Sequence, residues 1–162
     1  MKLVGYSDSD LAGDVDTCRS TTGVLFFLGG NLIIWQSQKQ KVVALSSCEA
    51  EYIAATTAAC QGIWLARLLA ELKAKEAGAT TLKIDNQSVI MLSKTPIFHD
   101  RSKHIDTKYH FIRDCIEEGR VKVEYISTRD VNGTDISRLY SNSIRSERVF
   151  IRPYPIPSIQ YP

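Results

Sequence analysis

Two adjacent glycines, Gly29 and Gly30, separate a pair of β-branched and aromatic runs and constrain the fold more than any other feature of the sequence. Two-residue glycine turns of this kind join antiparallel strands in a tight hairpin. The flanking runs, Gly23–Leu28 and Asn31–Gln36, are therefore predicted to be antiparallel strands. A short apolar run before them, Lys2–Tyr6, predicts another strand that ends in an acidic loop.

The rest of the chain alternates between helical and strand patterns. Either Ser46 or Ser47 can cap a long helix that continues to about Lys75, with Trp64, Leu65 and Leu68 predicted to form a core stripe on it. The later elements are predicted at Thr81–Ile84 (strand), Gln87–Lys94 (helix), about Ile105–Glu118 (helix) and Val121–Ile126 (strand). This order predicts an α/β fold with one mixed sheet and helices packed on it.

Composition places the chain among single globular domains, because 162 residues with 44% hydrophobic and 23% charged residues can bury a core. The net charge of +2 means that any basic surface must be local. The cysteines show no CxxC pair, so we expect reduced thiols in an intracellular protein and no disulfide. The apolar runs Val24–Leu28 and Ile63–Ala70 are short or interrupted by charge, so no transmembrane span is expected.

Four carboxylates fall at positions where chemistry is expected. Asp8 and Asp85 end predicted strands, Glu51 lies near the start of the long helix, and Asp135 lies beyond the last strand. If the first and fourth strands are parallel neighbours, their acids meet at the carboxyl edge of the sheet. Such a cluster would repel itself unless hard cations such as Mg²⁺ or Mn²⁺ were bound. Two ions about 3.5–4 Å apart can activate a water and stabilise a leaving 3′-oxygen, which makes a metal-dependent nuclease the natural reaction class.

Several stretches follow one another in a fixed order over residues 3–136. They are Gly5–Asp14, Arg19–Gly23, Trp35–Gln40, Ala44–Tyr52, Ile84–Ser88 and Lys103–Arg113. This series resembles the ribonuclease H domain of copia-type LTR retrotransposon Pol polyproteins. The resemblance implies a ribonuclease H-like fold with a five-stranded mixed sheet, three strands antiparallel and two parallel, and flanking helices over residues 1–140.

The same resemblance implies a function and a site. The catalytic and metal-binding acids would be Asp8, Glu51, Asp85 and Asp135, holding two Mg²⁺ or Mn²⁺ ions. The reaction would be hydrolysis of the RNA strand of RNA–DNA hybrids during reverse transcription. The expected partners are the hybrid and the reverse transcriptase domain of the same polyprotein, with no membrane and no small-molecule cofactor. The expected location is a cytoplasmic retrotransposon particle or the nucleus.

The sequence departs from the family pattern at several positions. Leu11 stands where the family commonly has Trp, and Cys48 where it commonly has Thr, and neither change removes an acid. The stretch Thr128–Ile136 is one residue longer than the family pattern Thr-x-Asp-Gln-x-Ala-Asp-Ile, and it carries Gly133 before its last Asp. Residues 141–162 lose periodicity and contain several prolines, which predicts a disordered tail. A frameshifted or decayed element copy would give this pattern, so the alternative is a module that binds nucleic acid or connects domains without cutting.

Other acids near the candidate site have simpler interpretations. Asp10, Asp14 and Asp16 share the first loop, which could be a solvated turn or a calcium loop, although the EF-hand pattern is incomplete. Glu49 and Glu51 lie two residues apart and face different sides of the helix. We select Glu51 as the site residue because it directly precedes an apolar helical run.

The most cationic stretch lies between Lys94 and Arg113 and holds all three histidines. It could contact the phosphates of a hybrid, or it could be an exposed helix face with ordinary histidines. His104 and His110 lie six residues apart, off the spacing that aligns two zinc ligands on a helix. The candidate nucleic-acid-binding residues are Arg101, Lys103, His104 and Lys108.

Overall fold

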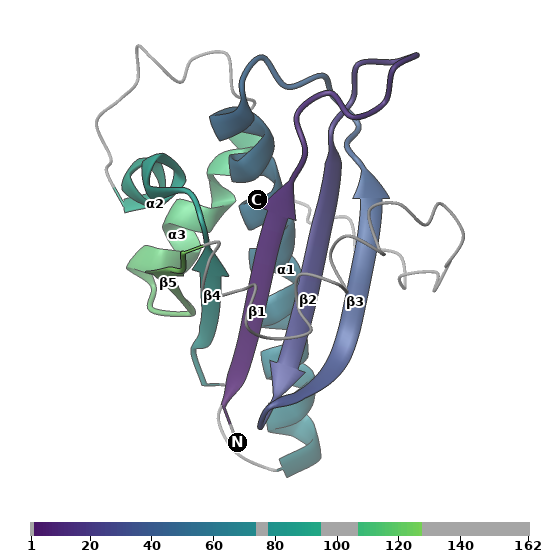
Figure 1. Cartoon of the computed structure of the whole chain (residues 1–162). Helices are drawn as coiled ribbons and strands as arrows, with labels where there is room; N and C mark the ends of the chain where they lie inside the picture. Colours follow the sequence, from purple (N-terminus) through teal and green to yellow (C-terminus); the bar gives the residue numbers. More distant parts are fainter. Residues whose placement is uncertain (1, 74–77, 95–106, 128–162) are drawn as a thin grey trace.

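The computed structural model describes residues 2–73, 78–94 and 107–127, and these form one five-stranded sheet with helices packed on it (Figure 1). The strands are β1 (Leu3–Ser9), β2 (Thr21–Leu28), β3 (Asn31–Lys39), β4 (Thr80–Ile84) and β5 (Val121–Tyr125). Their order across the sheet is β3-β2-β1-β4-β5. The three N-terminal strands pair antiparallel, whereas β4 pairs parallel with both β1 and β5. The mixed sheet expected from the sequence is confirmed.

The helices flank this sheet in the order that the sequence predicts. They are α1 (Ser47–Lys73), α2 (Gln87–Lys94), the 3₁₀ helix η1 (Thr107–His110) and α3 (Phe111–Glu117). The long α1 lies across one face of the sheet, and α2 and α3 lie beside it near β4 and β5 (Figure 1). The third predicted helix differs from its prediction, because its described part begins as a 3₁₀ turn before it becomes α-helical.

Strand ends also differ from their predictions by a few residues. β1 continues to Ser9, past the predicted end at Tyr6, so Asp8 is part of the strand. β3 likewise continues to Lys39. The hairpin between β2 and β3 is confirmed, since Gly29 and Gly30 adopt φ of 59° and 90°, a conformation that favours glycine. Strand pairing across the sheet extends these elements beyond what local apolar patterns indicate.

Side-chain caps define where two of the helices start. Ser46 Oγ accepts a hydrogen bond from the Glu49 backbone N–H at 3.1 Å, and a Glu49 side-chain oxygen accepts from the Leu45 N–H at 2.7 Å. At α2, the Asn86 side-chain oxygen accepts from the Val89 N–H at 3.2 Å. Each cap satisfies backbone donors that the first turn of a helix leaves free. The first turn of α1 is therefore held in one place relative to the loop before it.

The core lies between α1 and the sheet. Small residues let the helix approach closely: a Cβ on Gly62 would lie 2.8 Å from the Thr80 methyl, and the Thr80 hydroxyl donates to the Gly62 carbonyl at 3.0 Å. The prediction that Trp64, Leu65 and Leu68 are all core is wrong for two of them. Leu65 is 4% exposed, but Trp64 and Leu68 are 42% and 36% exposed. The first half of α1 is buried on nearly all sides, whereas its later turns bury only the side that faces the sheet.

Length and composition alone would allow α1 to cross a membrane, and no other helix among the described residues meets that test. Such a test is weak evidence, because the core helices of many folded domains pass it as well. Half of the most apolar window of α1 is buried in the fold. Packing against the sheet therefore accounts for much of its apolar character.

Candidate metal centre

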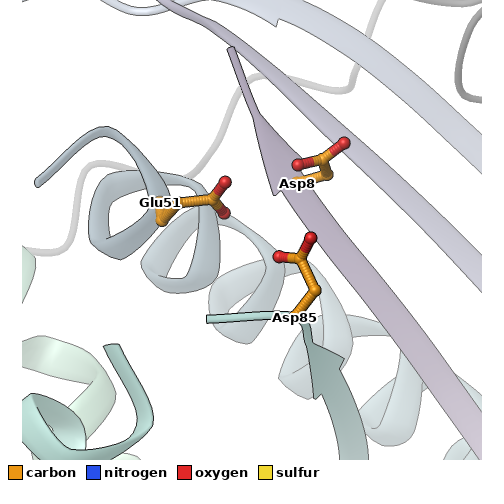
Figure 2. A group of neighbouring side chains, drawn as sticks. All are labelled: Asp8, Glu51 and Asp85. Carbon is orange, nitrogen blue, oxygen red and sulfur yellow. The ribbon is translucent and has the colours of Figure 1, made fainter. Parts of the chain in front are cut away.

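Three carboxylates from different parts of the chain converge at one edge of the sheet. Asp8 lies near the end of β1, and Asp85 directly follows β4. These strands are parallel neighbours, and the pairing of Tyr6 with Lys83 brings Asp8 level with Asp85 two residues further on. Glu51 reaches the same point from the start of α1 (Figure 2). One oxygen from each carboxylate lies within 4.8 Å of the others.

Burial and mutual repulsion keep part of this cluster protonated. Glu51 is 8% exposed, and its burial, together with the charges of Asp8 and Asp85, raises its pKa to about 9. The pKa of Asp8 is raised as well, mainly by burial and then by Asp85. Without a cation, Glu51 therefore keeps its proton at neutral pH and shares it with the Asp8 carboxylate.

The donor set fits a hard divalent cation. All the candidate ligand atoms are carboxylate oxygens, which Mg²⁺ and Mn²⁺ prefer. One oxygen of Glu51 is buried and has no hydrogen-bond partner among the described residues. The Asp8 carboxylate is oriented by the backbone N–H of Ser9, which donates a hydrogen bond to it at 2.8 Å. A cation at this point would satisfy the unpaired oxygen and remove the repulsion between the acids.

Two acids of the first loop are already engaged by protein donors. Asp10 accepts a hydrogen bond from the Thr21 backbone N–H. Asp14 accepts from the Thr17 hydroxyl and forms an ion pair with Lys39 at 2.6 Å, and the contact with Lys39 is the main reason that its pKa falls to about 2. These contacts favour the interpretation of this loop as a solvated turn over that of a calcium loop.

The remaining candidate residues lie in the helices or outside the described residues. His110 contacts the buried Tyr52 hydroxyl at 3.2 Å, and Thr56 donates to the Tyr109 carbonyl at 2.8 Å, so η1 is fastened to α1 by these residues. Glu49 belongs to the cap of α1 and not to the acid cluster. Residues Arg101, Lys103, His104 and Asp135 lie outside the described residues, as does the side chain of Lys108.

Gln40, the last residue of the stretch Trp35–Gln40, contacts residues that neighbour two of the acids in the sequence. It is 5% exposed, and its side chain contacts residues that lie 10 to 31 positions away in the sequence. No local pattern of apolar or charged residues reveals contacts over such distances. Its position becomes apparent only when β1, β2 and α1 are assembled.

Comparison with known structures identifies the fold class. The ribonuclease H1 LC11, isolated from compost, superimposes with a TM-score of 0.58 and covers 86% of this chain and 98% of its own at 15% identity. Its complex with an RNA/DNA hybrid gives a TM-score of 0.54. The protease-reverse transcriptase of prototype foamy virus gives 0.59 at 11% identity, over 90% of this chain and 21% of its own. These likenesses show that the chain has the ribonuclease H fold.

Sequence comparison identifies relatives with much higher identity. The retrovirus-related Pol polyprotein from transposon TNT 1-94 of Nicotiana tabacum is 48% identical over 128 residues, or 79% of this chain. That from transposon RE2 of Arabidopsis thaliana is 40% identical over 130 residues, or 80% of this chain. No family model matches the sequence. The chain is therefore homologous to one part of the retrovirus-related Pol polyproteins of plant transposons, and it spans 10% and 9% of the length of these two relatives.

Proposed function

We propose that this chain is a metal-dependent endonuclease that hydrolyses the RNA strand of RNA–DNA hybrids during reverse transcription of a copia-type retrotransposon. The observation that carries the proposal is the convergence of Asp8, Glu51 and Asp85 at the carboxyl edge of the sheet (Figure 2). The likeness to LC11, whose structure is known with an RNA/DNA hybrid, supports the same substrate. The reverse transcriptase region of the same polyprotein is the proposed partner, in a cytoplasmic particle or the nucleus.

In this proposal the acids act as metal ligands. Asp8, Glu51 and Asp85 would hold two Mg²⁺ or Mn²⁺ ions, with Asp135 as a further ligand. When bound, the cations would activate a water and stabilise the leaving 3′-oxygen. Glu51 must release its proton before it can act as an anionic ligand, because its pKa in the metal-free protein is about 9. Asp8 stays oriented throughout by the N–H of Ser9.

Recognition of the hybrid would rest on shape and on the 2′-hydroxyl groups, because the minor groove of an A-like duplex offers little sequence information. Phosphate contacts would come from the basic stretch, with Arg101, Lys103, His104 and Lys108 as the candidates. No covalent enzyme intermediate is needed, since the proposed nucleophile is water.

A second candidate function is binding or connection without cleavage. The extra residue and the glycine in the stretch before Asp135 favour it, because they alter the distance between the last strand and that acid. Only the nuclease predicts a cleavage product.

A cleavage assay separates the two. The RNA strand of an RNA–DNA hybrid is labelled and incubated with the protein and Mg²⁺, beside single-stranded RNA, duplex DNA and a sample with chelator. The nuclease is expected to cut the hybrid alone, and only with metal. Asp16→Asn is the matched control, because Asp16 is an exposed acid of the first loop. Binding of the hybrid without any cleavage would contradict the nuclease and favour a module that binds nucleic acid without cutting it.

A further inference from the structure

The side chain of Gln40 contacts Ser9 and Ala50, which directly neighbour two of the acids in the sequence. It directly follows β3, it is 5% exposed, and its backbone N–H donates to the Ser20 carbonyl at 2.8 Å. This bond ties the end of β3 to the start of β2. The side chain of Gln40 is thereby directed into the interior, where β1, β2 and α1 meet.

The side-chain nitrogen of Gln40 contacts acceptors on all three of these elements. The Ala50 carbonyl of α1 lies at 2.9 Å, the Thr22 hydroxyl of β2 at 3.1 Å and the Ser9 hydroxyl of β1 at 3.3 Å. An amide nitrogen carries two hydrogens, so the two shorter contacts can be full hydrogen bonds and the third is shared. One neutral side chain thus joins the strand and the helix that carry the acids.

The residues that Gln40 contacts are the immediate neighbours of two acids. Ser9 follows Asp8, and its N–H donates to the Asp8 carboxylate at 2.8 Å. Ala50 precedes Glu51 at the start of α1. When both carboxylates are ionised, as ligands of a cation are, the repulsion between them would be relieved if the first turn of α1 moved away from β1. A donor bound to the Ala50 carbonyl resists that movement, and it adds no charge that would compete with a cation.

We infer that Gln40 is a positioning residue that sets the separation between Asp8 and Glu51, and thereby the affinity of the acid cluster for divalent cations. This inference rests on the proposed metal-dependent function. Groups that orient metal ligands in this indirect way typically change metal affinity by about 10- to 100-fold when they are removed.

The other end of the Gln40 amide indicates that its main effect is not on stability. Its side-chain oxygen is buried and has no hydrogen-bond partner among the described residues. The lost hydration of such an oxygen offsets the gain from the hydrogen bonds of the nitrogen. Replacement by an apolar side chain of similar length should therefore alter the site more than the melting temperature.

The test measures Mn²⁺ binding directly. The electron paramagnetic resonance signal of free Mn²⁺ is followed while the ion is titrated into the wild type, Gln40→Met and the matched control Gln38→Met. Gln38 is an exposed glutamine of β3 whose side chain accepts a hydrogen bond from Gln36 at 2.9 Å. We expect the Kd for Mn²⁺ to rise about 10- to 100-fold in Gln40→Met and to stay at the wild-type value in Gln38→Met.

A kinetic measurement separates positioning from a general structural role. In the cleavage assay, the Mn²⁺ concentration that gives half the maximal rate should rise in Gln40→Met by the same factor as the Kd, and saturating Mn²⁺ should restore most of the rate. A merely structural role would lower the rate at every Mn²⁺ concentration and leave the half-saturating concentration unchanged.

A second variant keeps the inference testable if Gln40→Met does not fold. Thr22→Val preserves the volume of the side chain and removes one of the Gln40 partners, so a smaller rise in the Kd is expected. Wild-type affinity for Mn²⁺ in every folded variant of the two would overturn the role of Gln40 and leave the proposed function intact. If the wild type itself bound no Mn²⁺ at millimolar concentration, the proposed function would fail, and this inference with it.

Discussion

The protonation of Glu51 makes the stability of the metal-free protein depend on pH in a defined way. The pKa of Glu51 is about 9 in the folded chain and 4.5 as its ordinary value. Between these values the folded state binds a proton that the unfolded state has lost, so stability falls as the pH rises. The stabilisation is complete below about pH 4.5 and is lost progressively as the pH rises toward 9. One such proton corresponds to about 1.4 kcal/mol per pH unit.

Replacing Glu51 by Gln should abolish this dependence, because the amide does not titrate. Relative to Glu51→Gln, the wild type is expected to lose up to about 4 kcal/mol of unfolding free energy between pH 5 and pH 8. Urea unfolding in the presence of chelator measures the difference, and titrating groups that do not interact with Glu51 cancel in the comparison. Glu71→Gln, an exposed substitution on the same helix, is the control and should follow the wild type.

Two outcomes would contradict the protonation of Glu51 or its role in metal binding. Parallel stability curves for the wild type and Glu51→Gln would show that Glu51 is ionised in the metal-free fold, and the description of the cluster would be wrong. Addition of Mg²⁺ should flatten the dependence in the wild type, because a bound cation favours the ionised carboxylate. A slope that Mg²⁺ leaves unchanged would argue against metal binding at Glu51.

Four further predictions concern the site and the basic stretch. Asp8→Asn or Asp85→Asn should remove nearly all cleavage while the metal-free melting temperature stays equal or rises, as repulsion is relieved; retained cleavage in both would exclude them as essential ligands. Mg²⁺ or Mn²⁺ at 100 times its Kd should stabilise the wild type by about 2.7 kcal/mol, seen as a higher melting temperature in calorimetry, and no shift would count against the cluster. Replacing Arg101 and Lys103 by Ala should weaken hybrid binding and flatten its salt dependence by up to about one unit per lost phosphate contact, whereas an unchanged slope would indicate a solvated surface. Asp135→Asn should reduce the cleavage rate much less than Asp8→Asn. The extra residue before Asp135 is expected to displace this ligand, and a displacement of about 1 Å can already reduce the rate on the order of a hundredfold. Equal losses in the two variants would show that the loop before Asp135 accommodates the extra residue.

Local signals in the sequence were sufficient to predict the order and type of the described elements. The glycine turn at Gly29 and Gly30, the serine cap of α1 and the Asn86 cap of α2 each act within a few residues, so they can be read without knowledge of the fold. The meeting of Asp8 and Asp85 was also predictable, since the ends of parallel neighbouring strands share one edge of a sheet.

Tertiary structure alone decided the properties that depend on distant neighbours. Trp64 has the same apolar character as the core residues of α1, yet it is 42% exposed, since the later turns of α1 are covered only on the side of the sheet. The proton on Glu51 is a consequence of burial beside two other acids, which no short stretch of sequence contains. Gln40 acquires its contacts because β1, β2 and α1 close around it. Exposure, protonation and long-range hydrogen bonds depend on which segments pack together in space. The local spacing of residues along the chain does not determine which distant segments do so.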